Sequence, residues 1–272
     1  MKATKQAMST ARGVALLRTI EMGRPAAQRL TSDPYSRSFV NPITAFSTGL
    51  MVRSGLLDIV LPRGTIDFAI VRERYVEDLT IRETRQGIDQ LVILGAGFDT
   101  RAYRIPEIGD MPVYEVDHPA TQQAKRDALR RIGATLPPDH KFVAVDFDRD
   151  RLGDRLAAAG YSDLTQTGID ATLGFIAGRS APGSMVVFDY FHRDALSGSR
   201  AAVMQVMTRA MGERITFAID PGQIVPFLES RGFSDIDNAG APELRKLYLT
   251  GPNAKRPLLA GAAIVSARVA RN

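Results

Sequence analysis

The fold of this chain is decided by the stretch QLVILGAGFDTR, residues 90–101. Its first half is a short, continuous apolar run, which is typical of a strand buried in a parallel sheet. The run ends at Gly95 and Gly97, and glycine at the end of such a strand lets the backbone turn tightly and lets a ligand approach closely. The stretch therefore predicts a ligand-binding turn directly after a buried strand.

Further strand-like runs follow along the chain. PVYEVD (112–117), KFVAVDFD (141–148) and SMVVFDYF (184–191) are separated by stretches with helical periodicity. This alternation predicts an α/β fold with a mostly parallel sheet and helices on both faces. Two later runs, 214–219 and 262–270, have only short connections and predict an antiparallel C-terminal edge.

The first third of the chain has a different pattern. Residues 1–88 carry apolar side chains at three- and four-residue spacing, interrupted by turns, and contain no convincing strand. We expect a helical cap or lid over residues 1–88 and an α/β core over residues 89–272, folded as one structural unit.

Composition excludes several functions. The 272 residues include no cysteine, which excludes thiol nucleophiles and cysteine-ligated metals. The three histidines (His118, His140 and His192) are scattered, so we expect no metal site. Charges of both signs are mixed along the chain, so the net charge of +5 does not predict nucleic-acid binding. The longest apolar run, 258–267, is about half of a membrane span, and we expect a cytoplasmic protein.

Acidic residues follow the second and third strands. Glu115 and Asp117 lie about twenty residues after the glycine turn, where a carboxylate can accept hydrogen bonds from ribose hydroxyls. Asp146 and Phe147 follow the third strand, where a carboxylate can bind an amino group and an aromatic ring can flank a planar base. Together with the glycine turn, these residues predict a site for a nucleoside-type cofactor.

Two cofactors compete for such a site. A dinucleotide site usually has a third glycine, but Thr100 occupies that position here. S-adenosylmethionine (SAM) carries no phosphate, and its carboxylate suits an arginine such as Arg72 or Arg74. These residues leave a SAM-dependent enzyme and an NAD(P)-dependent oxidoreductase open, and taken alone the two arginines fit a solvated helix face better than a ligand site.

Several segments closely resemble the bacterial branch of the leucine carboxyl methyltransferase-like family, which are SAM-dependent O-methyltransferases. They are RERYVED (72–78), QLVILGAGFDTRAYRI (90–105), VYEVDHPATQQAK (113–125) and FVAVDFDRDRLGDRLAAAGY (142–161). The resemblance implies a class I SAM-methyltransferase (Rossmann-like) fold with an N-terminal helical cap. It also implies O-methylation of a carboxylate or hydroxyl on a small-molecule acceptor, of secondary-metabolite or lipid-like character.

The same resemblance implies a set of cofactor-binding residues. One would hold the methionine carboxylate, three would form the glycine turn, one would bind the ribose and two would bind the adenine. In that order they are Arg72, Gly95, Ala96, Gly97, Asp117, Asp146 and Phe147.

The acceptor is expected beside the strand at 184–191. A carboxylate acceptor is ionised at neutral pH and needs no base, whereas a hydroxyl needs one. Tyr190 and His192 are the candidate catalytic residues, with Asp189 beside them.

The chain departs from the family pattern between Asp163 and Leu164, where the family has one further central strand. Three explanations compete: residues missing from this sequence, a deletion accommodated by rearrangement, or a degenerate SAM-binding protein without activity. We favour the first. Neither the identity of the acceptor nor the oligomeric state is predicted.

Overall fold

The computed structural model describes residues 2–146, 150, 155, 158, 168–198, 202 and 218–271. The chain before the first strand is helical, as its periodicity predicts. In order, its elements are α1 (Lys2–Met22), η1 (Ala26–Gln28), η2 (Ser36–Phe39), α2 (Pro42–Arg53), α3 (Leu57–Val60) and α4 (Thr65–Arg85).

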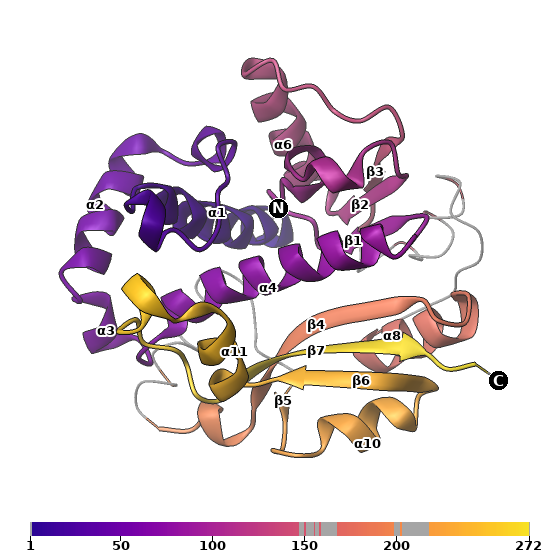
Figure 1. The fold of residues 1–272 in the computed structure, drawn as a ribbon. Coiled ribbons are helices and arrows are strands. Elements are labelled where there is room, and N and C mark those ends of the chain that lie inside the picture. The colour runs from indigo at the N-terminus through magenta and orange to yellow at the C-terminus, as the bar shows by residue number, and fades with distance from the viewer. Residues whose placement is uncertain are drawn as a thin grey trace.

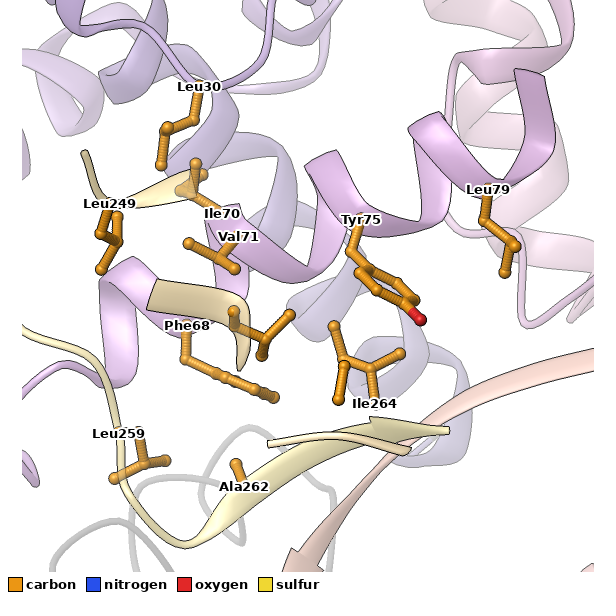
Figure 2. Close-up of a cluster of buried hydrophobic side chains, with 12 residues drawn as sticks. Leu30, Phe68, Ile70, Val71, Tyr75, Leu79, Leu249, Leu259, Ala262 and Ile264 are labelled. Carbon is orange, nitrogen blue, oxygen red and sulfur yellow. The ribbon is translucent and has the colours of Figure 1, made fainter. Parts of the chain in front are cut away.

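Helix α4 links these helices to the strands. Its apolar side chains recur every three or four residues, so Phe68, Val71 and Tyr75 lie on one face of the helix. Figure 2 shows these side chains directed at Ala262 and Ile264 of the last strand, in one buried cluster. Burying a side chain of this size contributes about 1.5–3 kcal/mol. The cluster therefore fixes α4 on the sheet.

A first sheet, sheet A, is entirely parallel. It contains β1 (Leu91–Leu94), β2 (Val113–Asp117) and β3 (His140–Ala144), in that spatial order. The connections between its strands contain α5 (Arg101–Arg104), η3 (Pro106–Ile108) and α6 (Pro119–Arg131). All three carboxyl ends lie at one edge because the strands are parallel.

A second sheet, sheet B, has the spatial order β5-β4-β7-β6. Its strands are β4 (Met185–His192), β5 (Ala218–Ile219), β6 (Phe233–Ala239) and β7 (Ala262–Val269). Strand β7 is antiparallel to both β4 and β6, so the predicted antiparallel C-terminal part of the sheet is confirmed for the run at 262–270. Strand β5, the described part of the run at 214–219, is instead parallel to β4, so the prediction was wrong for that run. The remaining described elements are α8 (Gly168–Arg179), η4 (Asp194–Leu196), α10 (Ile224–Glu229), α11 (Ala241–Tyr248) and η5 (Gly251–Asn253).

Strand β6 is absent from the strands that the sequence pattern predicts. Its register with β7 shifts between Ser234 and Asp237, and Asp235 has a positive φ of 48°. Such a bulge places an extra residue in one strand and breaks the two-residue alternation of side chains. The apolar positions Phe233, Ile236 and Ala239 therefore recur at three-residue spacing, which does not read as a strand.

The elements form layers in Figure 1. Helix α4 crosses the molecule between α1 and α2 on one side and the strands of sheet B on the other, and α10 lies beside β6. The α/β class, the mostly parallel core and the helices before it are as predicted. No described strand joins sheet A to sheet B. Asp163 and Leu164, where a further strand is expected, lie outside the described residues.

The described helices include none that combines the length and the apolar character needed to cross a membrane.

Candidate functional site

The turn after β1 depends on two glycines. Gly95 and Gly97 have φ values of 64° and 49°, in the left-handed region that favours glycine. A Cβ on Gly95 would meet no atom within 4 Å, so open space lies beside it. A Cβ on Gly97 would lie 3.2 Å from the Cβ of Ala11 in α1. One side of the turn is thus open, and the other is packed against the first helix.

Asp117 is brought to this turn by the pairing of β1 with β2. Leu94 pairs with Val116, so the residues that follow the two strands are neighbours. The Asp117 carboxylate accepts hydrogen bonds from the backbone N–H groups of Gly97 and His118. Burial raises the pKa of this carboxyl above its ordinary value, and the two hydrogen bonds oppose that rise. Each carboxylate oxygen keeps a lone pair for a ligand hydroxyl.

Glu115 has a different environment from Asp117. Its side chain is fully buried and pairs with Lys125 of α6, and its second oxygen lies 3.1 Å from Nε2 of His140. Because both partners come from elements that cover β2, this carboxylate is enclosed in the core. Asp117 is therefore the acid of the two that lies at the turn.

Asp146 follows β3 at the same edge of sheet A. The N–H of Val145 donates to the carbonyl of Asp117 at 2.9 Å, which places Asp146 one residue beyond the last link to β2. Its own N–H donates to the Asp150 carboxylate at 2.9 Å. Phe147, the predicted partner of Asp146, lies outside the described residues.

The two candidate arginines of α4, Arg72 and Arg74, face different surroundings. Arg72 donates to Asp189 of β4 at 3.4 Å and to Glu73 at 3.2 Å, and its side chain is about one quarter exposed. Asp189 raises the pKa of Arg72 above its ordinary value, against the effect of burial. Arg74 pairs instead with Asp78 on its own helix. Of these two arginines, Arg72 is the one that reaches a strand of sheet B.

Glu73 connects Arg72 to the glycine turn, and the sequence analysis did not identify it. Its carboxylate lies 3.5 Å from Arg101, which in turn pairs with Asp99 at 2.8 Å. Burial favours a raised pKa for Glu73, but the charges of Arg18, Arg72 and Arg101 outweigh burial and lower it. A chain of alternating charges thus runs from β4 to the turn after β1.

A second buried contact joins the first helix to the same turn. Arg18 of α1 donates to the carbonyl of Phe98 at 2.5 Å and pairs with Asp33 at 3.3 Å. Arg104, just after the turn, pairs with Glu77 of α4 at 2.9 Å. Residues from α1 and α4 therefore hold the turn from two directions. Only long-range contacts reveal these roles, because the partners of Arg18 and Glu77 lie far along the chain and the RERYVED segment that contains Glu77 does not indicate them.

Tyr190 and His192 lie on the face of β4 opposite Asp189, because side chains alternate along a strand. Tyr190 is buried in the cluster that contains Ile224 and Leu228, and its hydroxyl donates to Asn238 at 3.1 Å. The ring of His192 lies 5.7 Å from that of Tyr190, centroid to centroid. The catalytic role of both residues stays a prediction.

The chemistry of this edge suits an uncharged, hydroxyl-bearing ligand next to Asp117. The carboxylates of Asp99 and Glu73 near the turn are paired with Arg18, Arg72 and Arg101, so their charge does not separate SAM from a dinucleotide. Arg72 is partly exposed and has donors to spare for a carboxylate.

Comparison with protein families finds one match. The model of the leucine carboxyl methyltransferase family matches residues 11–172, which include the glycine turn, Asp117 and Arg72.

Curated relatives extend over most of the chain. The candidate SAM-dependent methyltransferase YktD of Bacillus subtilis is 29% identical over 66% of this chain and 66% of its own length. A candidate SAM-dependent methyltransferase of Mycobacterium sp. (strain KMS) is 30% identical over 74% of this chain and 80% of its own length. One from Mycobacterium ulcerans is 30% identical over 82% and 79%, respectively.

Among solved structures, the SAM-dependent methyltransferase SibL in its apo form aligns with 96% of this chain and 70% of its own. The TM-score is 0.45 and the sequence identity is 15%, a similarity too low to say anything about function.

Proposed function

We propose that this chain, which belongs to the leucine carboxyl methyltransferase family, transfers the methyl group of SAM to an oxygen atom of a small-molecule acceptor. It is a SAM-dependent methyltransferase by its family and its relatives. The part that we propose is the acceptor: a carboxylate or hydroxyl oxygen on a secondary metabolite or lipid-like molecule. The observation that supports the cofactor site is the hydrogen bond from the Gly97 N–H in the glycine turn to the Asp117 carboxylate.

The residues at the strand ends fit SAM. Open space lies beside Gly95, where a ligand must approach the backbone closely. Asp117 is buried and ionisable, and it keeps lone pairs for two ribose hydroxyls. Arg72 is partly exposed and would bind the methionine carboxylate, while Asp146 and Phe147 would bind the adenine. Each charge-assisted hydrogen bond contributes about 1.5–3 kcal/mol.

When bound, SAM supplies a methyl group on a positively charged sulfonium sulfur. Arg72, the glycine turn and Asp117 would hold SAM so that this methyl group would be presented to an acceptor oxygen. A carboxylate oxygen needs no deprotonation, so the main task of the protein is to align the two partners. Alignment of this kind contributes about 7–11 kcal/mol.

A hydroxyl acceptor would add a proton to remove. In that case His192 is our candidate base and Tyr190 the candidate residue beside it. The Tyr190 hydroxyl would have to leave Asn238 in order to reach an acceptor. A carboxylate acceptor, which requires neither residue, is therefore the simpler form of the proposal.

Residues 1–88 act as the lid of this site in our proposal. Ala11 and Arg18 of α1 contact the glycine turn, and Arg72 of α4 reaches β4. Such a lid would exclude water from the transferring methyl group.

The test is methyl transfer from SAM carrying a labelled methyl group. The purified protein is incubated with a panel of carboxylic acids, phenols, alcohols and amines, and labelled products are identified by mass spectrometry. A labelled methyl ester or ether supports the proposal. Labelled amines without labelled esters or ethers would overturn the O-methylation. Tight SAM binding without transfer to any acceptor would favour the degenerate, inactive alternative.

A further inference from the structure

A cavity of about 770 Å³ lies beside the carboxyl end of β4, outside the cofactor site. Its walls come from the loop before α4, the turn after β4, helix α11 and the segment that leads into β7. They share basic or apolar side chains, and they are Arg63, Ala195, Arg245, Ala254, Lys255, Arg256, Pro257, Leu258, Leu259, Ala260 and Gly261. Among these residues four are basic and none is acidic, which gives the cavity a positive potential.

The positive charge of the cavity is not neutralised within the described part of the chain. Neither Arg63 nor Lys255 makes a hydrogen bond or an ion pair with any described residue. Arg245 donates only to uncharged groups, the carbonyls of Ala254 and Arg256, each at 2.9 Å. Three cations therefore face the cavity without a carboxylate partner, which is the arrangement that an anion would complete.

The wall of the cavity is held in place by the fourth cation. Arg256 is buried and binds both oxygens of Glu21 at 2.9 and 3.0 Å, and it binds Asp67 at 2.6 Å. These bonds tie the 254–261 segment to α1 and α4. The charge of Arg256 is thus neutralised by Glu21 and Asp67, while Arg63 and Lys255 are exposed on the rim of the cavity.

The cavity is within reach of the proposed methyl-transfer site. The N–H of His192, the last residue of β4, donates to the carbonyl of Gly261 in the cavity wall at 2.8 Å. Asp189, the partner of Arg72, is three residues earlier in β4, which corresponds to about 10 Å along a strand. A single extended molecule can therefore reach both places.

We propose that this cavity binds an anionic group of the acceptor, a carboxylate or phosphate attached to an apolar body, at a distance from the oxygen that is methylated. Arg63, Arg245 and Lys255 bind the anion, and Leu258 and Ala260 contact the apolar body. The inference rests on the proposed function, because that function makes the bound molecule an acceptor. It adds a specificity site that recognises a part of the acceptor outside the reaction.

The test compares decanoate, decyl phosphate and decan-1-ol by calorimetric titration of the full chain, below the concentrations at which they form micelles. At least one of the two anions should bind roughly tenfold more tightly than the alcohol, because two exposed cations add favourable charge pairs. The better of the two anions identifies the group as carboxylate or phosphate. Equal binding of all three molecules would overturn the inference.

A matched pair of double variants removes the effect of net charge. Arg63→Gln with Lys255→Gln should bring anion binding to the level of the alcohol. Arg131→Gln with Lys246→Gln removes the same charge from exposed positions outside the cavity and should leave anion binding unchanged. Equal weakening in both double variants would reduce the effect to net charge and overturn the site.

SAM affinity is measured on the same samples and should be equal in the wild type and both double variants. A wild type that binds the anions but not SAM contradicts the proposed function while the cavity assignment stands. A wild type that binds SAM but does not prefer the anions contradicts only the cavity assignment.

Discussion

Replacement of Asp117 by asparagine tests the cofactor site with the smallest change of shape. One carboxylate oxygen accepts the N–H of Gly97 and the other accepts the N–H of His118. Asparagine has one oxygen and one NH₂ group, and the NH₂ group cannot accept a hydrogen bond. Whichever way the amide is oriented, one of the two backbone donors loses its acceptor.

The magnitude follows from the hydrogen bonds lost. A hydrogen bond to a charged group contributes about 1.5–3 kcal/mol, and each 1.4 kcal/mol corresponds to about tenfold in affinity. Loss of the charge that faces one ribose hydroxyl should therefore weaken SAM binding by roughly 10- to 150-fold. The fold itself should lose less, because the asparagine also removes the cost of burying an ionised group, which raises the pKa of Asp117.

The assay is calorimetric titration with SAM, supported by the shift in melting temperature that SAM produces. Asp127→Asn makes the same chemical change on a half-exposed carboxylate of α6 and should leave SAM affinity unchanged. If Asp117→Asn binds SAM within about twofold of the wild type while folded, the ribose contact is wrong.

Four further outcomes are expected. Arg72→Ala should weaken SAM binding by about tenfold or more, whereas Arg74→Ala, which loses Asp78 on its own helix and the carbonyl of Leu30, should not; equal effects in the same titration would contradict the assignment. Burial raises the pKa of Asp117, so SAM affinity should fall as the pH is lowered through that raised value, and Asp117→Asn should remove this dependence in titrations across the range. The folded, SAM-free protein holds the Asp117 proton more tightly than the unfolded chain does. Its free energy of unfolding should therefore fall as the pH rises from the ordinary pKa of an aspartate to the raised pKa of Asp117. Arg256→Ala leaves the buried Asp67 without its ion-pair partner and leaves Glu21 with Arg24 alone, and it should cost about 3–5 kcal/mol, which calorimetry would record as a melting temperature roughly 10 °C lower; a loss below about 1 kcal/mol would refute that reasoning.

The strands of the core follow from the sequence because their signals are local. Continuous apolar runs mark β1, β2 and β4, and their flanking glycine and acidic residues mark the strand ends. Strand β6 does not follow, because the bulge at Asp235 changes its spacing. Alternation of apolar and polar side chains identifies a strand in the sequence only where that strand is regular.

The candidate site was foreseen in part, for a similar reason. Glu115 and Asp117 share a face of β2, and alternation alone cannot tell them apart. Lys125 and His140, from α6 and β3, enclose the first and leave the second at the turn. Glu73 was missed because its partners come from residues far along the chain, such as Arg101. Contacts of that kind depend on how the elements pack, which no single stretch of sequence records.

Ala11 lies close to the glycine turn. A Cβ added at Gly97 would lie 3.2 Å from the Cβ of Ala11, so little free space separates the first helix from the turn. Because the proposed cofactor site is built on this turn, we expect a larger side chain at position 11 to alter SAM affinity, although it lies 86 positions from the turn (97 − 11).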